Sequence, residues 1–229
     1  MKSRRSCAST WRGAALKICR QKKRKALRNP WQPPRTYVHA WSLHLCRALA
    51  YLHGSFPALV HRDVKPGNIL LSRDLSEVKL ADFGLARTCS EGAYDMTGLT
   101  GTKRYMAPEV YRQEKDYGPG VDVYSAAVIM WQMCTGHRPW ETHEADEVAR
   151  RGASEEELRP PLNELSWVEL RPIIAQAWRG DPSQRPSANE MLSSLETVKG
   201  RPGMEKKCFI GMGSCGVSLS CWKGGGGLR

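Results

Sequence analysis

One segment, residues 121–135, limits what this chain can fold into more than any other feature. Its residues are apolar nearly all round a helical surface, not along a single stripe. A helix of this kind is buried on every side, so other elements must surround it. Its longest apolar run, residues 126–133, falls well short of the roughly 20 residues that a membrane-spanning helix needs. We therefore predict a mainly helical domain built around this segment, with no membrane span.

Apolar residues at three- and four-residue steps indicate further helices. The clearest runs over residues 37–53 and ends at Gly54. Three shorter helical segments are expected, near residues 144–151, 167–178 and 187–198. Two apolar strands, residues 69–71 and 78–81, are joined by a polar turn and predict a small hairpin. The polar segment 82–109 has no core pattern, and loops of this length in compact domains are usually functional.

The positive charge of the chain lies at its N-terminus. The chain has 229 residues and a formal net charge of +12. Residues 1–35 contain twelve Lys and Arg and no acid, which leaves 23 basic residues against 23 acidic ones in the rest. A nucleic-acid-binding domain would spread basic residues over a folded face, so we expect no nucleic acid partner. We interpret residues 1–35 as a disordered basic head; a transit peptide and a nuclear-import patch at residues 22–25 stay open.

The eight cysteines form no CxxC motif and no paired spacing typical of a metal site. We find no secretory signal pattern, so we expect reduced thiols and a cytoplasmic location, with organelle or nuclear targeting by the basic head as the alternative. Cys46 and Cys134 fall in apolar helical runs and are expected to be small core residues.

Three short motifs follow one another at a specific spacing. They are His61-Arg62-Asp63-Val64-Lys65-Pro66-Gly67-Asn68, Asp82-Phe83-Gly84 and Ala107-Pro108-Glu109. Each alone is a weak signal, but together, on a loop, a hairpin and a long polar segment, they are a strong one. In these motifs the chain resembles the catalytic domain of eukaryotic protein kinases over about residues 37–198. The resemblance implies a kinase-like α+β fold that is mainly α, a helical C-lobe with a small β-hairpin at the catalytic loop.

The resemblance implies chemical roles for residues of the first two motifs. Asp63 would orient the attacking hydroxyl and accept its proton, and Lys65 would place a cation at the transferring phosphoryl group. Asn68 and Asp82 would supply oxygen ligands to Mg²⁺, which prefers such donors. Leu70 would contact ATP at the floor of the adenine pocket. The alternative is that Leu70 is an ordinary core residue of its strand.

Other matching residues are architectural by the same resemblance. His61 and Phe83 would belong to the hydrophobic stack of side chains that is assembled in active kinases. Gly84 would belong to the turn of the magnesium loop. Asp122 is expected to cap the start of the buried helix and to accept hydrogen bonds from the catalytic-loop backbone. Glu109 is expected to form a desolvated ion pair with Arg185, 76 positions later.

The sequence also bears on substrate class and regulation. Lys65, and Gly101-Thr102 before the third motif, resemble serine/threonine kinases. Residues 177–187 resemble the tyrosine-kinase-like branch, many members of which phosphorylate serine and threonine. Arg62, directly before Asp63, implies regulation by loop phosphorylation, because a phosphate there would meet a guanidinium. The candidate acceptors are Ser90, Thr97 and Thr100, and for each of them an ordinary loop hydroxyl is the alternative.

The resemblance divides the chain into three regions: a head (1–35), a partial kinase domain consisting of the C-lobe (36–199) and a flexible Gly-rich tail (200–229). No Gly-rich loop or lysine-bearing strand precedes the matching region, so we expect the N-lobe to be largely absent and nucleotide binding by the chain as printed to be weak. Residues 211–216 have G-x-G-x-x-G spacing, but the valine comes one residue after the last glycine instead of two. The start of a second kinase unit is therefore the alternative there.

The predicted function is a protein serine/threonine kinase that transfers the γ-phosphoryl group of ATP to a protein hydroxyl with Mg²⁺. The alternative is a catalytically inactive kinase-like module that presents its helical lobe to partners. Both hypotheses imply a protein partner. The oligomeric state does not follow from the sequence.

Overall fold

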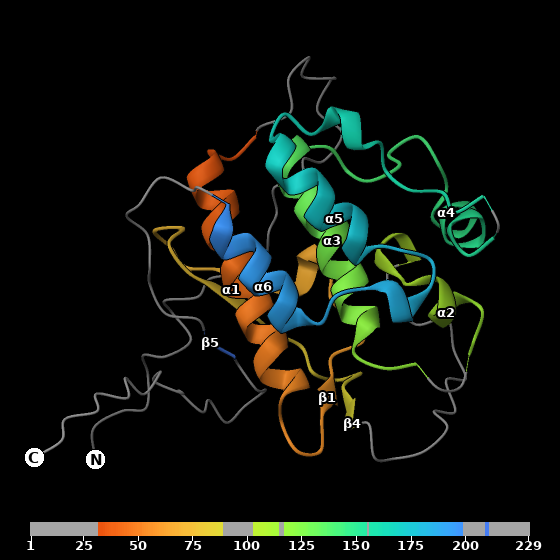
Figure 1. Ribbon diagram of the computed structural model, residues 1–229, viewed down its shortest axis with the longest axis horizontal. Helices are drawn as coiled ribbons and strands as arrows, with labels where there is room; N and C mark the ends of the chain where they lie inside the picture. Colours follow the sequence, from red (N-terminus) through yellow and green to blue (C-terminus); the bar gives the residue numbers. More distant parts are fainter. Residues whose placement is uncertain (1–31, 89–102, 115–116, 155, 199–208, 211–229) are drawn as a thin grey trace, which may run out of the picture.

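The buried segment predicted from the sequence is a helix that other helices enclose. The structure, a computed structural model, describes residues 32–88, 103–114, 117–154, 156–198 and 209–210. Helix α3 (Gly120–Thr135) is buried along nearly its whole length. Helices α1 (Arg35–His53) and α5 (Arg171–Ala177) pack against α3, and α6 (Ala188–Thr197) packs against both α1 and α5 (Figure 1). The core of the domain lies between these four helices.

Local sequence signals explain where two of the helices begin. The helix expected over residues 167–178 is shorter than predicted, because a 3-10 turn, Val168–Leu170, precedes α5. Pro172 lies in the first turn of α5, where a backbone N–H would have no acceptor within the helix, so the lack of one costs nothing. Helix α6 begins with a capping box: the Ser187 hydroxyl accepts from the Glu190 N–H at 3.2 Å, and the Glu190 carboxylate accepts from the Ser187 N–H at 2.7 Å.

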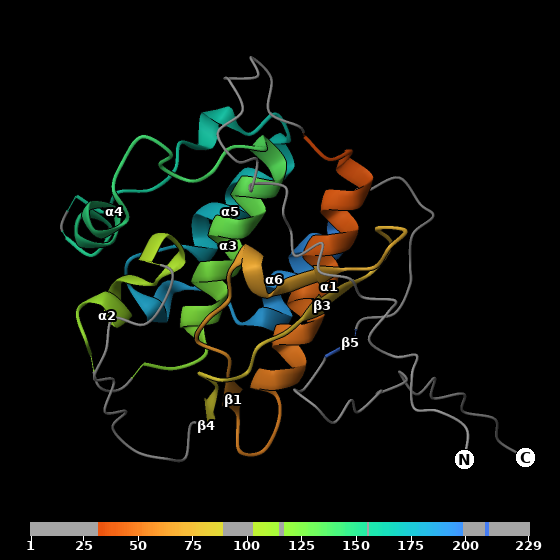
Figure 2. The same cartoon turned by 180° about the vertical axis from the view of Figure 1, so that it is seen from behind.

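The strands form two small sheets. β2 (Ile69–Leu71) and β3 (Val78–Leu80) make the expected antiparallel hairpin, with Leu70 opposite Lys79. β5 (Phe209–Ile210) pairs in parallel with the other edge of β3. β1 (Leu59–Val60) pairs with β4 (Arg87–Thr88) in the second sheet. The hairpin lies against α1, beside the path of the catalytic loop (Figure 2).

The remaining elements are short. They are α2 (Pro108–Tyr111), α4 (Ala145–Gly152) and the 3-10 turns Pro66–Asn68, Lys103–Tyr105, Leu162–Glu164 and Pro182–Gln184. The composition of the fold, mostly helix with little strand, agrees with the kinase-like α+β class. Most of the predicted head and tail lies outside the described residues, as do the candidate acceptors Ser90, Thr97 and Thr100.

The two cysteines placed in helical runs form no disulfide within the described residues. Cys46 is fully buried and Cys134 is half-buried. Burial raises the pKa of the Cys134 thiol to about 12, so it stays protonated at neutral pH. The described part of the chain contains no helix with the length and apolarity that a bilayer crossing requires.

Candidate active site

The catalytic-loop motif is anchored to the central helix by the carboxylate of Asp122. The main-chain N–H groups of His61 and Arg62 donate to its two oxygens, each at 2.8 Å. The ring Nε2 of His53, the last residue of α1, lies 2.9 Å from Oδ2. Because Asp122 is only 1% exposed, these groups replace the water that would otherwise solvate the carboxylate. The loop is thereby fixed to both α1 and α3.

The prediction that Asp122 caps α3 is wrong. The helix begins at Gly120 with Pro119 as its N-cap residue, so Asp122 lies inside the first turn. Its carboxylate still benefits from the positive end of the helix, but its bonds go to the catalytic loop. The second half of the prediction, hydrogen bonds from the catalytic-loop backbone, is confirmed.

Replacing Asp122 by Ala is expected to lower the free energy of unfolding by about 2–3 kcal/mol, because two buried N–H groups lose their acceptor. Urea denaturation of the purified variant measures this change. Asp146→Ala is the control, since Asp146 is an exposed partner of Lys103 whose removal should cost at most about 1 kcal/mol. Equal costs for the two variants would contradict the anchoring role.

The side chain of Asp63 is held by two neighbours from its own loop. Lys65 Nζ lies 2.5 Å from Oδ2, and Asn68 Nδ2 donates to the same oxygen at 2.9 Å and to the Asp63 carbonyl at 2.8 Å. In the part of the chain that the structure describes, Oδ1 of Asp63 receives no hydrogen bond. One carboxylate oxygen is therefore fixed, and the other is left for a group that enters the site.

The imidazole of His61 joins the catalytic loop to the loop after β3. It is fully buried, its Nδ1 accepts from the Asp63 N–H at 3.3 Å, and its Nε2 lies 3.1 Å from the Ala81 carbonyl. Since a carbonyl only accepts, Nε2 must carry the proton, and the ring is the Nε2–H tautomer. The Phe83 ring packs edge-on against it, with centroids 4.9 Å apart. His61 and Phe83 are thus in contact, as a shared stack requires.

Asp82 lies where the hairpin brings it next to Asn68. The Ala81 N–H donates to the Asn68 carbonyl at 2.8 Å, so Asn68 and Asp82 flank the same end of the hairpin. Asp82 is exposed and has a φ of 65°, a left-handed conformation that is uncommon outside glycine. The Gly84 N–H faces its Oδ1 at 3.4 Å. The turn therefore directs a solvated carboxylate beside the catalytic loop.

The donor set at this end of the hairpin fits a magnesium ion. Both protons of the Asn68 amide point to Asp63, which leaves its Oδ1 as the atom that can meet a cation. With the Asp82 carboxylate, this gives two oxygen donors, and Mg²⁺ commonly takes one or two protein ligands and completes its shell with phosphate and water. No cluster of three or more His, Cys, Asp or Glu suited to a metal occurs among the described residues.

Leu70 and Arg62 lie at the edges of this site. In β2, Ile69 and Leu71 are buried while Leu70 between them is only half-buried, so Leu70 faces away from the core. A leucine in this position offers an apolar surface at the hairpin. Arg62 has a φ of 68° and places its guanidinium over the ring of Tyr117, 5.9 Å from the centroid.

The predicted ion pair between Glu109 and Arg185 is present and buried. Two guanidinium nitrogens of Arg185 donate to the two carboxylate oxygens at 2.6 and 2.8 Å, and the side chains are 0% (Arg185) and 1% (Glu109) exposed. The remaining donors of Arg185 reach three carbonyls, those of Arg179, Gly120 and Gly180, at 2.8–3.2 Å. All five N–H donors are therefore satisfied, as a buried arginine requires. The pair ties α2 to the segment before α6.

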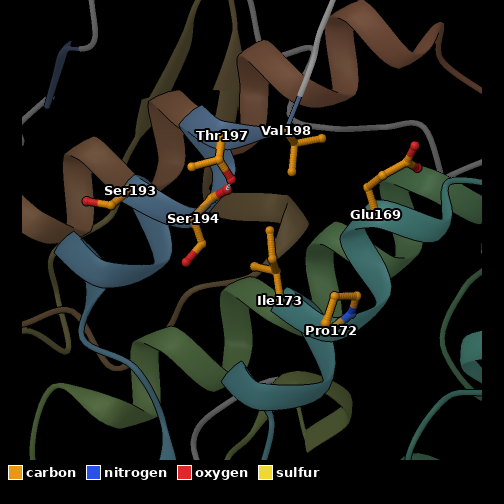
Figure 3. Close-up of a pocket in the computed structure, with 7 residues that line it drawn as sticks. All are labelled: Glu169, Pro172, Ile173, Ser193, Ser194, Thr197 and Val198. Atoms are coloured by element: carbon orange, nitrogen blue, oxygen red, sulfur yellow. Dashed lines mark hydrogen bonds between the residues drawn. The ribbon is translucent and has the colours of Figure 1, made fainter.

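No role was predicted for His53, although it is one of the three partners of Asp122. The available signal was its place as the last residue of the helix that leads into the catalytic loop. A groove of about 620 Å³ was also not foreseen; it lies between the 3-10 turn–α5 region and α6 (Figure 3). Its lining, which includes Glu169, Ile173 and Thr197, contains none of the predicted catalytic residues, so it is separate from the candidate active site.

Comparison with known proteins decides the family. The sequence model of the protein kinase domain matches residues 16–195. This chain belongs to the protein kinase domain family. The family resemblance inferred from the three motifs is thus confirmed, and the residues of the kinase motifs can be discussed as parts of a kinase domain.

The chain is also similar in sequence to individual protein kinases. The chain is 37% identical over 172 residues to the serine/threonine-protein kinase VIK of Arabidopsis thaliana, covering 72% of this chain and 38% of that protein. It is 35% identical over 166 residues to mitogen-activated protein kinase kinase kinase 7 of Bos taurus, covering 71% and 28%. The dual specificity protein kinase shkC of Dictyostelium discoideum is 35% identical over 150 residues, covering 65% and 29%. The chain thus spans about a quarter to two fifths of the length of these relatives.

Proposed function

We propose that this chain supplies the catalytic loop and the magnesium loop of a protein serine/threonine kinase. The reaction moves the γ-phosphoryl group of ATP to a protein hydroxyl. The bond from phosphorus to the β–γ bridging oxygen breaks, a bond from phosphorus to the hydroxyl oxygen forms, and the hydroxyl proton is released. Such a reaction asks the protein mainly to position groups and to balance charge.

The observation that carries this proposal is the hydrogen bonding of the Asp63 carboxylate. Lys65 and Asn68 hold Oδ2, while Oδ1 receives no hydrogen bond from the described residues. A substrate hydroxyl that donates to Oδ1 would be oriented for attack, and its proton would pass to this oxygen. Lys65 stays beside Asp63 as a cation for the transferring group. Asn68 and Asp82 would hold Mg²⁺, which when bound neutralises phosphate charge.

Two observations support serine and threonine as the substrate hydroxyls. Lys65 after Asp63 resembles the serine/threonine pattern, and the printed names of the relatives include serine/threonine and dual specificity kinases. The chain spans 38% or less of the length of the relatives named above. We therefore propose kinase activity for a protein that contains these residues together with an ATP-binding lobe. The catalytically inactive module remains the competing hypothesis, and activity distinguishes the two.

The test is phosphate transfer by this chain joined to a complete ATP-binding lobe. We expect incorporation of labelled phosphate from Mg²⁺-ATP into a general serine/threonine substrate, and at least about tenfold less into a matched peptide whose only hydroxyl is tyrosine. Phosphoamino-acid analysis of the product identifies the acceptor. A folded protein that transfers no phosphate would favour the inactive module, and a preference for tyrosine would contradict the substrate class.

A further inference from the structure

The groove between the 3-10 turn–α5 region and α6 (the α5–α6 groove) has an apolar floor. Its volume of about 620 Å³ lies in the roughly 300–1,000 Å³ range typical of ligand sites. Ile173 of α5 and Val198, which follows α6, point toward one another across it (Figure 3). Pro172, which also lines the groove, is exposed, and Val168, next to the lining residue Glu169, is 58% exposed. The groove therefore offers apolar surface that a partner can cover.

The wall formed by α6 presents hydrogen-bond acceptors to this groove. Ser194 Oγ donates to the Glu190 carbonyl at 2.9 Å, and Thr197 Oγ1 donates to the Ser194 carbonyl at 2.7 Å. A hydroxyl group has a single proton, so both oxygens have used theirs within α6 and can only accept from a ligand. The third hydroxyl of the wall, that of Ser193, points away from Ile173 (Figure 3). The groove therefore favours a ligand group that donates hydrogen bonds.

The end of α6 adds a partial negative charge to the same wall. A helix carries roughly half a negative charge at its C-terminal end, which favours a cation there. α6 ends at Thr197 and has no basic residue in its last turn. Two arginines of neighbouring elements are engaged elsewhere: Arg47 pairs with Glu196 at 3.0 Å, and Arg171 donates to carbonyls in the segment 163–165 at 2.7–3.3 Å. Among the described residues, no basic side chain lines the groove, so a cationic donor must come from a ligand.

Glu169 stands at the rim of the groove. It is exposed, and its side chain points away from Ile173 (Figure 3). An exposed carboxylate gains little from an ion pair, because both charges lie in a medium of high dielectric constant. The cation of a ligand is therefore expected at the end of α6 and not at Glu169.

We propose that the α5–α6 groove binds a segment of a protein partner in which a leucine or a similar apolar residue adjoins an arginine or lysine. The apolar side chain covers Ile173 and Val198, and the cation donates to the hydroxyl oxygens of Ser194 and Thr197 at the end of α6. Complementarity to a groove that combines an apolar floor, acceptors and a partial negative charge selects this occupant. Long basic side chains suit it, because their apolar stems lie on apolar surface while the charged group reaches polar atoms. The proposal does not depend on phosphate transfer, since none of the predicted catalytic residues lines the groove.

Peptide binding to the 229-residue chain, followed by NMR of its methyl groups, tests the groove. The probe is a short peptide of glycine, leucine and arginine that contains no hydroxyl side chain. Two matched peptides replace its arginines by glutamate or its leucines by alanine. We expect the first peptide to shift the methyl signals of Ile173 and Val198 in a saturable way, and each matched peptide to bind at least about tenfold more weakly. This comparison uses the wild-type chain, so it does not depend on whether a variant folds.

Two variants locate the cation. Ser194→Ala combined with Thr197→Val removes both acceptor hydroxyls at exposed positions, and should weaken binding of the leucine–arginine peptide by at least about fivefold. Glu169→Gln is the matched control and should stay within about twofold of wild type. Thermal denaturation shows whether each variant keeps its fold.

Several results would overturn the proposal. Equal binding of the glutamate peptide, or unchanged binding in the hydroxyl variant, would remove the cation from the end of α6, and loss of binding in Glu169→Gln would move it to the rim. Methyl shifts that appear without peptide as the chain is concentrated would assign the groove to a second copy. Binding that appears only after removal of residues 199–229 would assign it to this chain itself. A chain that binds the peptide but transfers no phosphate when joined to an ATP-binding lobe would refute the proposed function and leave the groove assignment standing.

Discussion

Arg185→Ala is expected to lower the free energy of unfolding by about 3–5 kcal/mol, because it leaves the buried carboxylate of Glu109 without a partner. Glu109→Ala should be similarly harmful, since it leaves a guanidinium that is 0% exposed. In Arg185→Ala a second effect lowers the free energy of unfolding, because three carbonyl groups also lose their hydrogen-bond donor. Urea denaturation of each variant measures the change.

A double-mutant cycle separates the pair from its surroundings. The variant with both alanines leaves no unmatched charge, so its cost should be smaller than the sum of the two single costs. Arg47 and Glu196 are the control, because they form the same kind of pair at 3.0 Å with side chains 36% and 50% exposed. Each control substitution should cost at most about 1 kcal/mol. Additive costs at Glu109 and Arg185 would contradict a coupled buried pair.

Arg185→Lys is a sharper test of the geometry. A lysine keeps the charge but cannot reproduce two parallel bonds to Glu109 together with three bonds to carbonyls. We expect it to recover less than half of the stability that Arg185→Ala loses. Full recovery would mean that charge alone, without the planar fork, holds the end of α2 to the segment before α6.

Periodicity located the large elements because burial imposes it. The apolar residues of 121–135 and 37–53 must face a core, and the helices found there differ from the expected ranges by at most two residues where they begin. The hairpin was visible for another reason, because two short apolar runs, residues 69–71 and 78–81, are joined by a polar turn. The pairing of β1 with β4 was not, because two-residue strands carry no period to detect.

The candidate site was predictable as far as its motifs reach. The kinase resemblance implied one site for Asp63, Asn68 and Asp82, and the hairpin brings Asn68 and Asp82 to the same end. What spacing could not show is which atoms meet. The helix start at Gly120 moved Asp122 off the cap position, and His53 joined the network from an element that carries no motif. Both depend on tertiary packing that no local pattern encodes.

The substitution with the largest expected effect on rate is Asp63→Asn. In the chain joined to an ATP-binding lobe, turnover should fall by about 10³-fold or more, because the amide neither accepts the hydroxyl proton nor carries the charge that orients the donor. Asn has the same size as Asp and can still accept a hydrogen bond from Lys65, whose side chain is 28% exposed. The free energy of unfolding should therefore change by less than about 1 kcal/mol.

The control for Asp63→Asn is Glu169→Gln, which makes the same carboxylate-to-amide change in the groove of Figure 3, away from the catalytic loop. It should leave turnover within about twofold of wild type. Steady-state rates and thermal denaturation of the same preparations then separate chemistry from folding. If Asp63→Asn lost stability in proportion to its loss of rate, the carboxylate would be a support for the loop. If it kept more than a tenth of wild-type turnover, Oδ1 would not be the atom that receives the substrate hydroxyl.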